Sequence, residues 1–284
     1  MCELAFLSLH RKAIHFHSTN QTMSPKEAVS SGQLDIALRE LEADIRKNPA
    51  DLSLRIYLFQ LLSVLGQWKR ASDQLDFIEG MKLNEVMAEI FKPLVQNEIL
   101  RSDVFAGKTI PLIFGEPQAW GELLFKALQE EVRGNLQLAA NLRVEALEKA
   151  PATAGKINED HFDWICDADS RLGPVLEACV NKKYYWIPWN KIKSIIFHPP
   201  SDLRDIVWAP VEFVWANNDQ AKGHVFVRYS GTDKSDDHQL KLSRLTQWEE
   251  KHKNQFHGLG QRMLTTDQKD YSLLEIRSLE LIHG

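Results

Sequence analysis

The chain has 284 residues, 44% of them hydrophobic, and a formal net charge of −5. This length allows two domains. The acidic balance argues against a general nucleic-acid-binding protein, which needs a surplus of Lys and Arg for its phosphate contacts. No run of 18 apolar residues exists, so no membrane span is expected.

The first 22 residues differ from a secretory signal, because their short apolar run, Leu4 to Leu9, precedes the basic residues instead of following them. A helix start follows at once: Ser24 can act as the cap, Pro25 suits the first position and Glu27 completes a capping box. We therefore expect Met23 to be the natural first residue. Residues 1–22 are predicted to be disordered or an upstream extension.

The first half of the chain contains a helical repeat. Similar stretches begin at Gly32, Gly66 and Gly134; the first two lie 34 residues apart and the third lies 68 further on. An Ala follows each Gly five positions later. A repeat of this length indicates a stacked array of helix pairs. The predicted helices span residues 25–31, 33–47, 51–65, 67–79, 119–131 and 136–149.

The third period of the repeat is degenerate. Leu100 stands where the pattern requires Gly, and Pro93 lies inside the expected helix, which it should kink or end. A loop with two glycines and two prolines is expected after Asp103.

Residues 24–151 resemble the tetratricopeptide repeat in period, in the spacing from Gly to Ala and in the closing Pro151. Stacked pairs of this type form a groove that can hold a partner peptide or helix. The alternative is that the C-terminal half of the chain fills the groove and the repeats are only a scaffold.

The second half is rich in aromatic and β-branched residues. Val211, Phe213 and Trp215 alternate against a second alternating set, which predicts a hairpin; the second set is Val225, Val227 and Tyr229. The alternation returns in residues 238–245, whereas residues 246–254 indicate a polar turn or a short helix. The predicted fold class is α+β with two domains. Tetratricopeptide-like helical repeats occupy residues 23–151, and a mostly antiparallel, Trp-rich α+β domain that could be barrel-like occupies residues 152–284.

Four segments of the second half resemble the ImpE/TagJ family, in its order and spacing: 167–177, 184–192, 204–211 and 258–264. This family provides accessory components of bacterial type VI secretion systems. The resemblance implies a cytoplasmic, non-enzymatic adaptor that binds the small subunit of the contractile sheath through that subunit's N-terminal helix. It also implies an influence on sheath assembly, or on its disassembly by the ClpV ATPase as an indirect partner.

The acidic cluster of Asp163, Asp167 and Asp169 is the strongest candidate for chemistry in the second half. It lacks the spacing and the closing Glu of a calcium loop. We expect Asp169 or Asp167 to form an ion pair with Arg171 instead, or to face a partner. The rival hypothesis is an enzyme or metal-dependent module that uses Asp167 and Asp169 in a polar pocket.

The tryptophans could form a core or a partner surface, with the core as the default. Trp186 and Trp189 cannot share one face of a regular strand, so either one is exposed or Pro188 ends the strand. We expect Trp186, Trp189 and Trp208, with the Asp167, Asp169 and Arg171 group, to lie at a partner-binding surface or at the junction of the two domains.

Other motifs are absent or incomplete, so no cofactor or metal is expected. The ten histidines include no His-x-x-x-His pair, and the three cysteines have no Cys-x-x-Cys spacing, which favours a reducing compartment. Gly107-Lys108-Thr109 lacks the upstream glycine of a phosphate loop. A third hypothesis for function is a scaffold that recruits an ATPase through the convex face of the repeats.

Overall fold

The computed structural model describes residues 23–81, 85–116 and 118–282. Its first half is helical and its second half is built mainly from strands, as expected for an α+β protein. The predicted extension, residues 1–22, lies outside the described residues. Within them, no helix combines the length and the apolar character needed to cross a membrane. The helices are α1 (Pro25–Ser30), α2 (Leu34–Lys47), α3 (Leu52–Leu65), α4 (Trp68–Gly80), α5 (Glu85–Phe105), α6 (Ala119–Val132), α7 (Leu136–Lys149) and the short α8 (His238–Lys241).

The repeat pattern forms helix pairs as predicted. The Ser24 hydroxyl accepts a hydrogen bond from the backbone of Glu27, whose carboxylate accepts one from the backbone of Ser24, so α1 begins with the expected capping box. The repeated alanines Ala37, Ala71 and Ala139 are fully buried. A small side chain at these positions lets the two helices of a pair approach closely.

The degenerate period forms one long helix, α5, which does not end at Pro93. A proline inside a helix removes one N–H group and leaves the carbonyl four residues earlier without its usual donor. That residue is Glu89, which is exposed. Water can therefore satisfy its carbonyl, which lowers the cost of continuing the helix.

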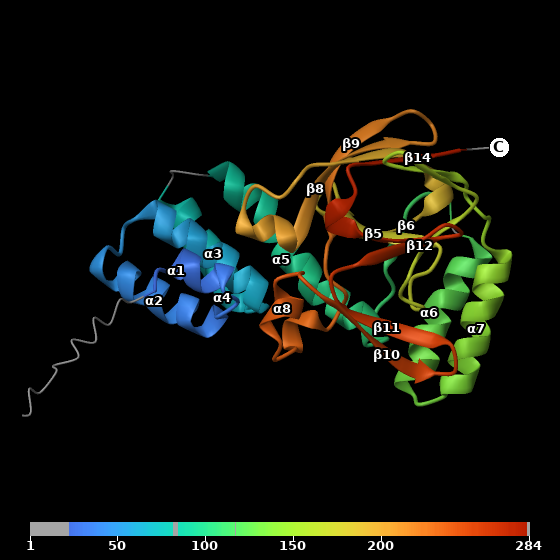
Figure 1. Ribbon diagram of the computed structural model, residues 1–284, viewed down its shortest axis with the longest axis horizontal. Coiled ribbons are helices and arrows are strands. Elements are labelled where there is room, and N and C mark those ends of the chain that lie inside the picture. The colour runs from blue at the N-terminus through green and yellow to red at the C-terminus, as the bar shows by residue number, and fades with distance from the viewer. Residues whose placement is uncertain (1–22, 82–84, 117, 283–284) are drawn as a thin grey trace, which may run out of the picture.

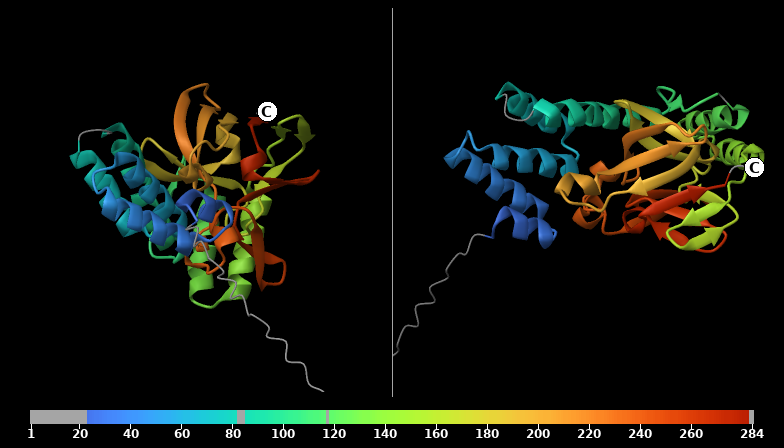
Figure 2. Two further views of the ribbon diagram at one scale, coloured as in Figure 1. Left: turned by 60° about the vertical axis from the view of Figure 1, so that its left-hand side comes forward. Right: turned by 90° about the horizontal axis from the view of Figure 1, so that it is seen from above.

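The segment after α5 joins the main sheet of the C-terminal half. It was expected to be a loop, but Leu112–Ile113 forms strand β1, which pairs in parallel with β6 (Lys183–Pro188). Helices α6 and α7 then lie at the opposite end of the molecule from α1–α4, with the sheets between them (Figures 1 and 2). The described repeats are thus split into two groups, and the boundaries of the two predicted domains stay a prediction.

The main sheet has nine strands in the order β1-β6-β5-β9-β8-β7-β14-β2-β3. Every pairing except β1 with β6 is antiparallel. β1 and β3 are its two edges, so the sheet is open and is not a closed barrel. Its remaining strands are β2 (Gly155–Ile157), β3 (Asp160–Phe162), β5 (Val175–Val180), β7 (Ile192–Phe197), β8 (Trp208–Trp215), β9 (Gln220–Phe226) and β14 (Ser278–Leu281).

The smaller sheets supply the rest of the second half. One has the order β13-β12-β4 and the other pairs β10 with β11. The predicted hairpin of β8 and β9 is present, but Phe213 lies opposite Ala221, and Val227 and Tyr229 follow the end of β9. Two local predictions were wrong: residues 238–241 form α8, which Asp237 caps, and residues 246–252 form a strand. The strands are β4 (Ile165–Asp167), β10 (Thr246–His252), β11 (Gln255–Gly260), β12 (Met263–Thr266) and β13 (Asp270–Ser272).

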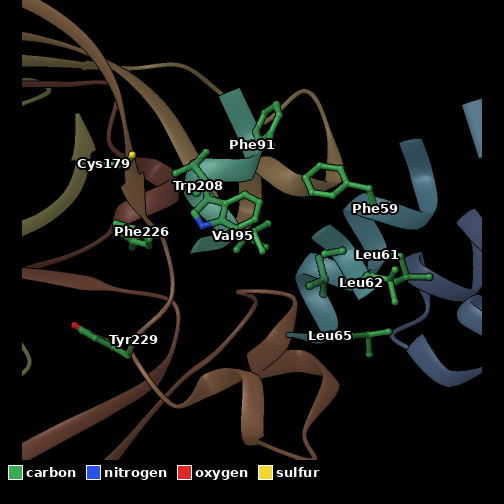
Figure 3. Packing of buried hydrophobic residues seen from close by; sticks show 14 of the residues in the cluster. Phe59, Leu61, Leu62, Leu65, Phe91, Val95, Cys179, Trp208, Phe226 and Tyr229 are labelled. Atoms are coloured by element: carbon green, nitrogen blue, oxygen red, sulfur yellow. The ribbon is translucent and has the colours of Figure 1, made fainter. Parts of the chain in front are cut away.

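Two hydrophobic cores lie on the two faces of the main sheet. On one face, Phe213, Ile195 and Leu279 belong to a cluster with Leu264 of β12. The opposite face packs against the helices, where the Trp208 ring lies 6.4 Å from that of Phe59 and 6.2 Å from that of Phe91 (Figure 3). The two halves of the chain therefore share one core.

The C-terminal half also covers the turns of the first two repeats. Gly32 and Gly66 have positive φ angles of 77° and 72°. An added Cβ would lie 2.2 Å from the side chain of Gln239 at Gly32, and 2.3 Å from that of Asp233 at Gly66. The left-handed backbone favours glycine at both turns. At Gly66 the close approach of Asp233 Cβ adds a second constraint, whereas the atom near Gly32 is the end of the flexible Gln239 side chain.

Arginines of the C-terminal half cap the ends of the repeat helices. Arg228 donates from Nη1 to the carbonyl of Val64, at 2.6 Å, and from Nη2 to that of Ser63, at 3.1 Å. Arg244 donates from Nη2 to the carbonyl of Val29, at 3.2 Å. The last carbonyls of a helix lack donors within the regular helix. Those of Val29 and Ser63 also accept from the backbone N–H groups of Gly32 and Gly66, so the arginines add a second donor there, and Arg228 supplies a donor to Val64.

The covered turns can be tested against the third glycine. Gly66→Ala should lower the free energy of unfolding by at least about 2 kcal/mol more than Gly134→Ala, because both force alanine into a left-handed backbone but only Gly66 is covered. Denaturant unfolding of both variants measures the difference. Equal losses would show that the contact with Asp233 adds nothing.

Candidate functional site: the buried ionic junction

Helix α5 presents two charged side chains, Glu98 and Arg101, to the main sheet. They are three residues apart and therefore share one face of the helix. Arg101 forms two parallel hydrogen bonds to Glu177 of β5, at 2.7 Å from Nε to Oε1 and 2.8 Å from Nη2 to Oε2. Such a bidentate pair fixes orientation as well as distance, so it sets the position of α5 on the sheet.

Glu177 is shared by a second arginine. Arg262, which is 0% exposed, donates from Nη2 to Glu177 at 2.5 Å and from Nη1 to Asp167. Tyr184 also donates its hydroxyl to Glu177. The carboxylate thus joins α5, the main sheet and the segment that precedes β12.

The predicted ion pair of Asp169 and Arg171 is present. Arg171 Nε donates to Asp169 Oδ1 at 2.8 Å, and the backbone N–H of Gly258 donates to Oδ2 at 2.8 Å. Asp167 does not pair with Arg171, because Arg262 and Tyr229 engage its oxygens. Since both carboxylates are committed to protein donors, neither is free to hold a cation. The described residues contain no group of three His, Cys, Asp or Glu that could bind a metal ion.

A fourth arginine and a fourth carboxylate complete the cluster. Glu98 accepts a hydrogen bond from Trp208 Nε1 at 3.0 Å, and Arg228 donates to the end of α3 as described above. Four carboxylates and four guanidinium groups give the cluster no formal net charge. We call this set the buried ionic junction: Glu98, Arg101, Asp167, Asp169, Arg171, Glu177, Arg228 and Arg262.

Two carboxyl groups of the junction, Glu177 and Asp167, have pKa values shifted in opposite directions. Burial alone would raise the pKa of Glu177, but the charges of Arg101 and Arg262 outweigh it and lower that pKa to about 2. Burial raises the pKa of Asp167 to about 6, in spite of the opposing charge of Arg262. The different outcomes follow from the partners, because Glu177 has two arginines and Asp167 has one.

The junction offers no room for a substrate. The cavity beside it, lined by Glu98, Arg101, Arg228 and their neighbours, has a volume of about 10 Å³, which is enough for one water molecule. A larger pocket of about 410 Å³ lies between α5 and the main sheet, lined in part by Cys179 and His224. Burial raises the pKa of Cys179 to about 11 and lowers that of His224 to about 4. A thiol nucleophile needs the opposite shift, so this pair is poorly suited to catalysis.

The three candidate tryptophans are buried in the two cores. Trp186 and Trp208 lie in the core between helices and sheet, and Trp189 lies in the other core. Of the two alternatives for this segment, an exposed tryptophan or a strand that ends at Pro188, the structure shows the second. Trp208 donates to Glu98, so it contacts the buried ionic junction, which also contains Asp167 and Asp169. Trp189 instead donates to the carbonyl of Gly173, at 3.1 Å.

Sequence reasoning missed Glu98, Arg101, Glu177, Arg228 and Arg262. The signal for Glu177 was present, since it is a single charge within an otherwise apolar strand, VLEACV, whose residues are all buried. A charge at such a position requires a buried partner. The arginines carried no comparable signal, because they lie in segments where exposed charges are ordinary.

Comparisons with known proteins agree with the resemblance seen in the sequence. Residues 159–280 match the model of the ImpE protein family. The chain is 39% identical, over 261 residues and 91% of each chain, to a Pseudomonas aeruginosa protein described as type VI secretion system accessory component TagJ. This chain belongs to the ImpE/TagJ family. The crystal structure of protein VPA1032 from Vibrio parahaemolyticus is similar to this ImpE/TagJ chain, with a TM-score of 0.84 and 26% identity, and covers 92% of this chain and 98% of its own.

In this ImpE/TagJ chain, Glu177→Gln should lower the free energy of unfolding by about 3–5 kcal/mol, because it removes the buried counter-charge that Arg101 and Arg262 share and leaves each arginine with one carboxylate partner, Glu98 or Asp167. Glu89→Gln is the matched control, since it removes an exposed ion pair with Lys182 and should cause no measurable change. Denaturant unfolding at pH 7 measures both. A small loss for Glu177→Gln would mean that water or rearrangement compensates the two arginines.

The difference between wild type and Glu177→Gln should also depend on pH. The folded-state pKa of Glu177 lies below its ordinary value of 4.5, so its ionised form stabilises the fold above pH 4.5, and this contribution is lost as the pH falls toward about 2. Unfolding curves should therefore converge between pH 4.5 and 2. A constant gap across that range would contradict the lowered pKa.

Proposed function

We propose that this chain is a non-enzymatic accessory component of a bacterial type VI secretion system. The observation that carries the proposal is the similarity along 91% of both chains to a protein of that description. The similarity spans both the helices and the sheets, so it concerns the whole architecture rather than one shared module.

The specific activity that we propose is that of a cytoplasmic adaptor. It binds the N-terminal helix of the small sheath subunit and thereby influences sheath assembly, or disassembly by the ClpV ATPase. Large exposed apolar side chains support a role in protein binding, since Val132 is 59% exposed and Leu138 is 45% exposed.

The burial of the acidic group favours an adaptor over an enzyme that uses Asp167 and Asp169. Both carboxylates are almost completely buried, and both are bonded to arginines. An acid–base or metal-binding role needs an accessible carboxylate in a pocket with room for a substrate.

Co-purification of the tagged chain with the small sheath subunit tests the proposal. The full-length subunit should be retained, and a subunit that lacks its first helix should be lost. A subunit in which the helix is scrambled at constant composition controls for nonspecific binding. Equal retention of all three subunits, or of none, would sink the proposal.

A further inference from the structure

The three glycine turns of the repeat have similar sequences but different surroundings. At Gly32 and Gly66, side chains of the C-terminal half lie where a Cβ atom would be. At Gly134, nothing lies within 4 Å of that position. The first two turns are therefore covered by the chain itself, and the third is open.

Apolar side chains at the third turn are exposed where their counterparts are buried. Two positions after the glycine, Leu34 is 0% exposed, whereas Leu136 is 37% exposed. Two positions before it, Val64 is 0% exposed, whereas Val132 is 59% exposed. The surface is hollow at this turn, with a volume of about 660 Å³ lined by Gly134, Asn135, Leu136, Gln137, Leu138 and Asn141.

The backbone at the third turn also lacks a partner that the other turns have. Arg244 donates to Val29, three positions before Gly32, and Arg228 donates to the carbonyls three and two positions before Gly66. The equivalent carbonyls belong to Glu131 and Val132. No side chain in residues 23–81, 85–116 and 118–282 donates to either of them.

The charges at this end of α6 favour a cation. The C-terminus of a helix carries a partial negative charge. Of the two carboxylates in the last turn of α6, that of Glu131 is already paired with Arg143, so the open carbonyls rather than this carboxylate attract a cation. The nearest arginine in sequence, Arg133, is directed to Glu130, at 2.6 Å from Nη1 to Oε1. A guanidinium group matches the site better than an ammonium group, because its fork of donors can reach two carbonyls at once.

We propose that the surface from Val132 to Leu138 is a docking site for a short helical segment of a partner protein. This segment presents an arginine to the carbonyl end of α6 and an apolar side chain to Val132 and Leu136. The partner's arginine would make, between two proteins, the same kind of contact with helix carbonyls that Arg228 and Arg244 make within this chain. That the partner presents a helix rests on the proposed function. The docking site adds where this helix binds and which side chains it presents.

Fluorescence anisotropy with a labelled synthetic peptide, the N-terminal helix of the small sheath subunit, tests this assignment. Val132→Lys and Leu136→Lys should each weaken binding about tenfold or more, because they place a cation where the arginine and its apolar neighbour dock. Ile196→Lys is the control: Ile196 is 46% exposed on the main sheet, so its variant should bind the peptide as the wild type does. Melting temperatures confirm that all variants are folded.

A second arm replaces each arginine of the peptide with lysine, which keeps the charge and removes the fork of donors. One of these lysine-containing peptides should bind the wild-type protein severalfold more weakly than the unmodified peptide does. The same two peptides should bind the Val132→Lys variant equally. Undiminished binding by both surface variants, or by every arginine-replaced peptide, overturns the docking site and leaves the proposed function intact. A wild-type chain that does not bind the peptide overturns both.

Discussion

The bond between Arg101 and Glu177 determines how the two halves of the chain fit together. Without it, α5 would be held on the main sheet by single polar contacts, such as the bond from Trp208 to Glu98, and by apolar contacts, which tolerate small shifts along a helix. Two parallel hydrogen bonds tolerate much less displacement. The core around Trp208 and the caps on α3 all depend on α5 lying at that one position.

Such a junction is costly to build. Each buried charge loses its hydration, and a buried ion pair often gives no more net stability than a well-packed apolar pair. In this molecule the cost is limited because Glu177 accepts hydrogen bonds from two arginines and a tyrosine, and because Arg228 donates to the carbonyl of Val64 at the end of α3. The junction fixes the geometry between α5 and the main sheet.

The sequence was informative where a pattern is local. Glycine spacing, alanine positions and the alternation in β8 all report on contacts within a few residues, and they predicted the helix pairs and the hairpin. The wrong predictions concern residues whose environment is made by distant segments. β10 has few buried side chains, so it lacks alternation, and only its pairing with β11 makes it a strand. The buried ionic junction joins residues up to 127 positions apart, as in the bond from Arg101 to the carbonyl of Arg228, and no local rule pairs them.

The position of β14 limits the order in which the molecule can be built. This strand, Ser278–Leu281, lies between β7 and β2 in the main sheet, although β2 and β3 precede it by more than a hundred residues. While the chain is being synthesised, β2 and β3 can pair with each other, but they cannot join the rest of the main sheet until residues 278–281 have left the ribosome. The sheet is therefore completed only after translation of the described part of the chain is finished, and until then one edge of β7 is open to other proteins, including chaperones.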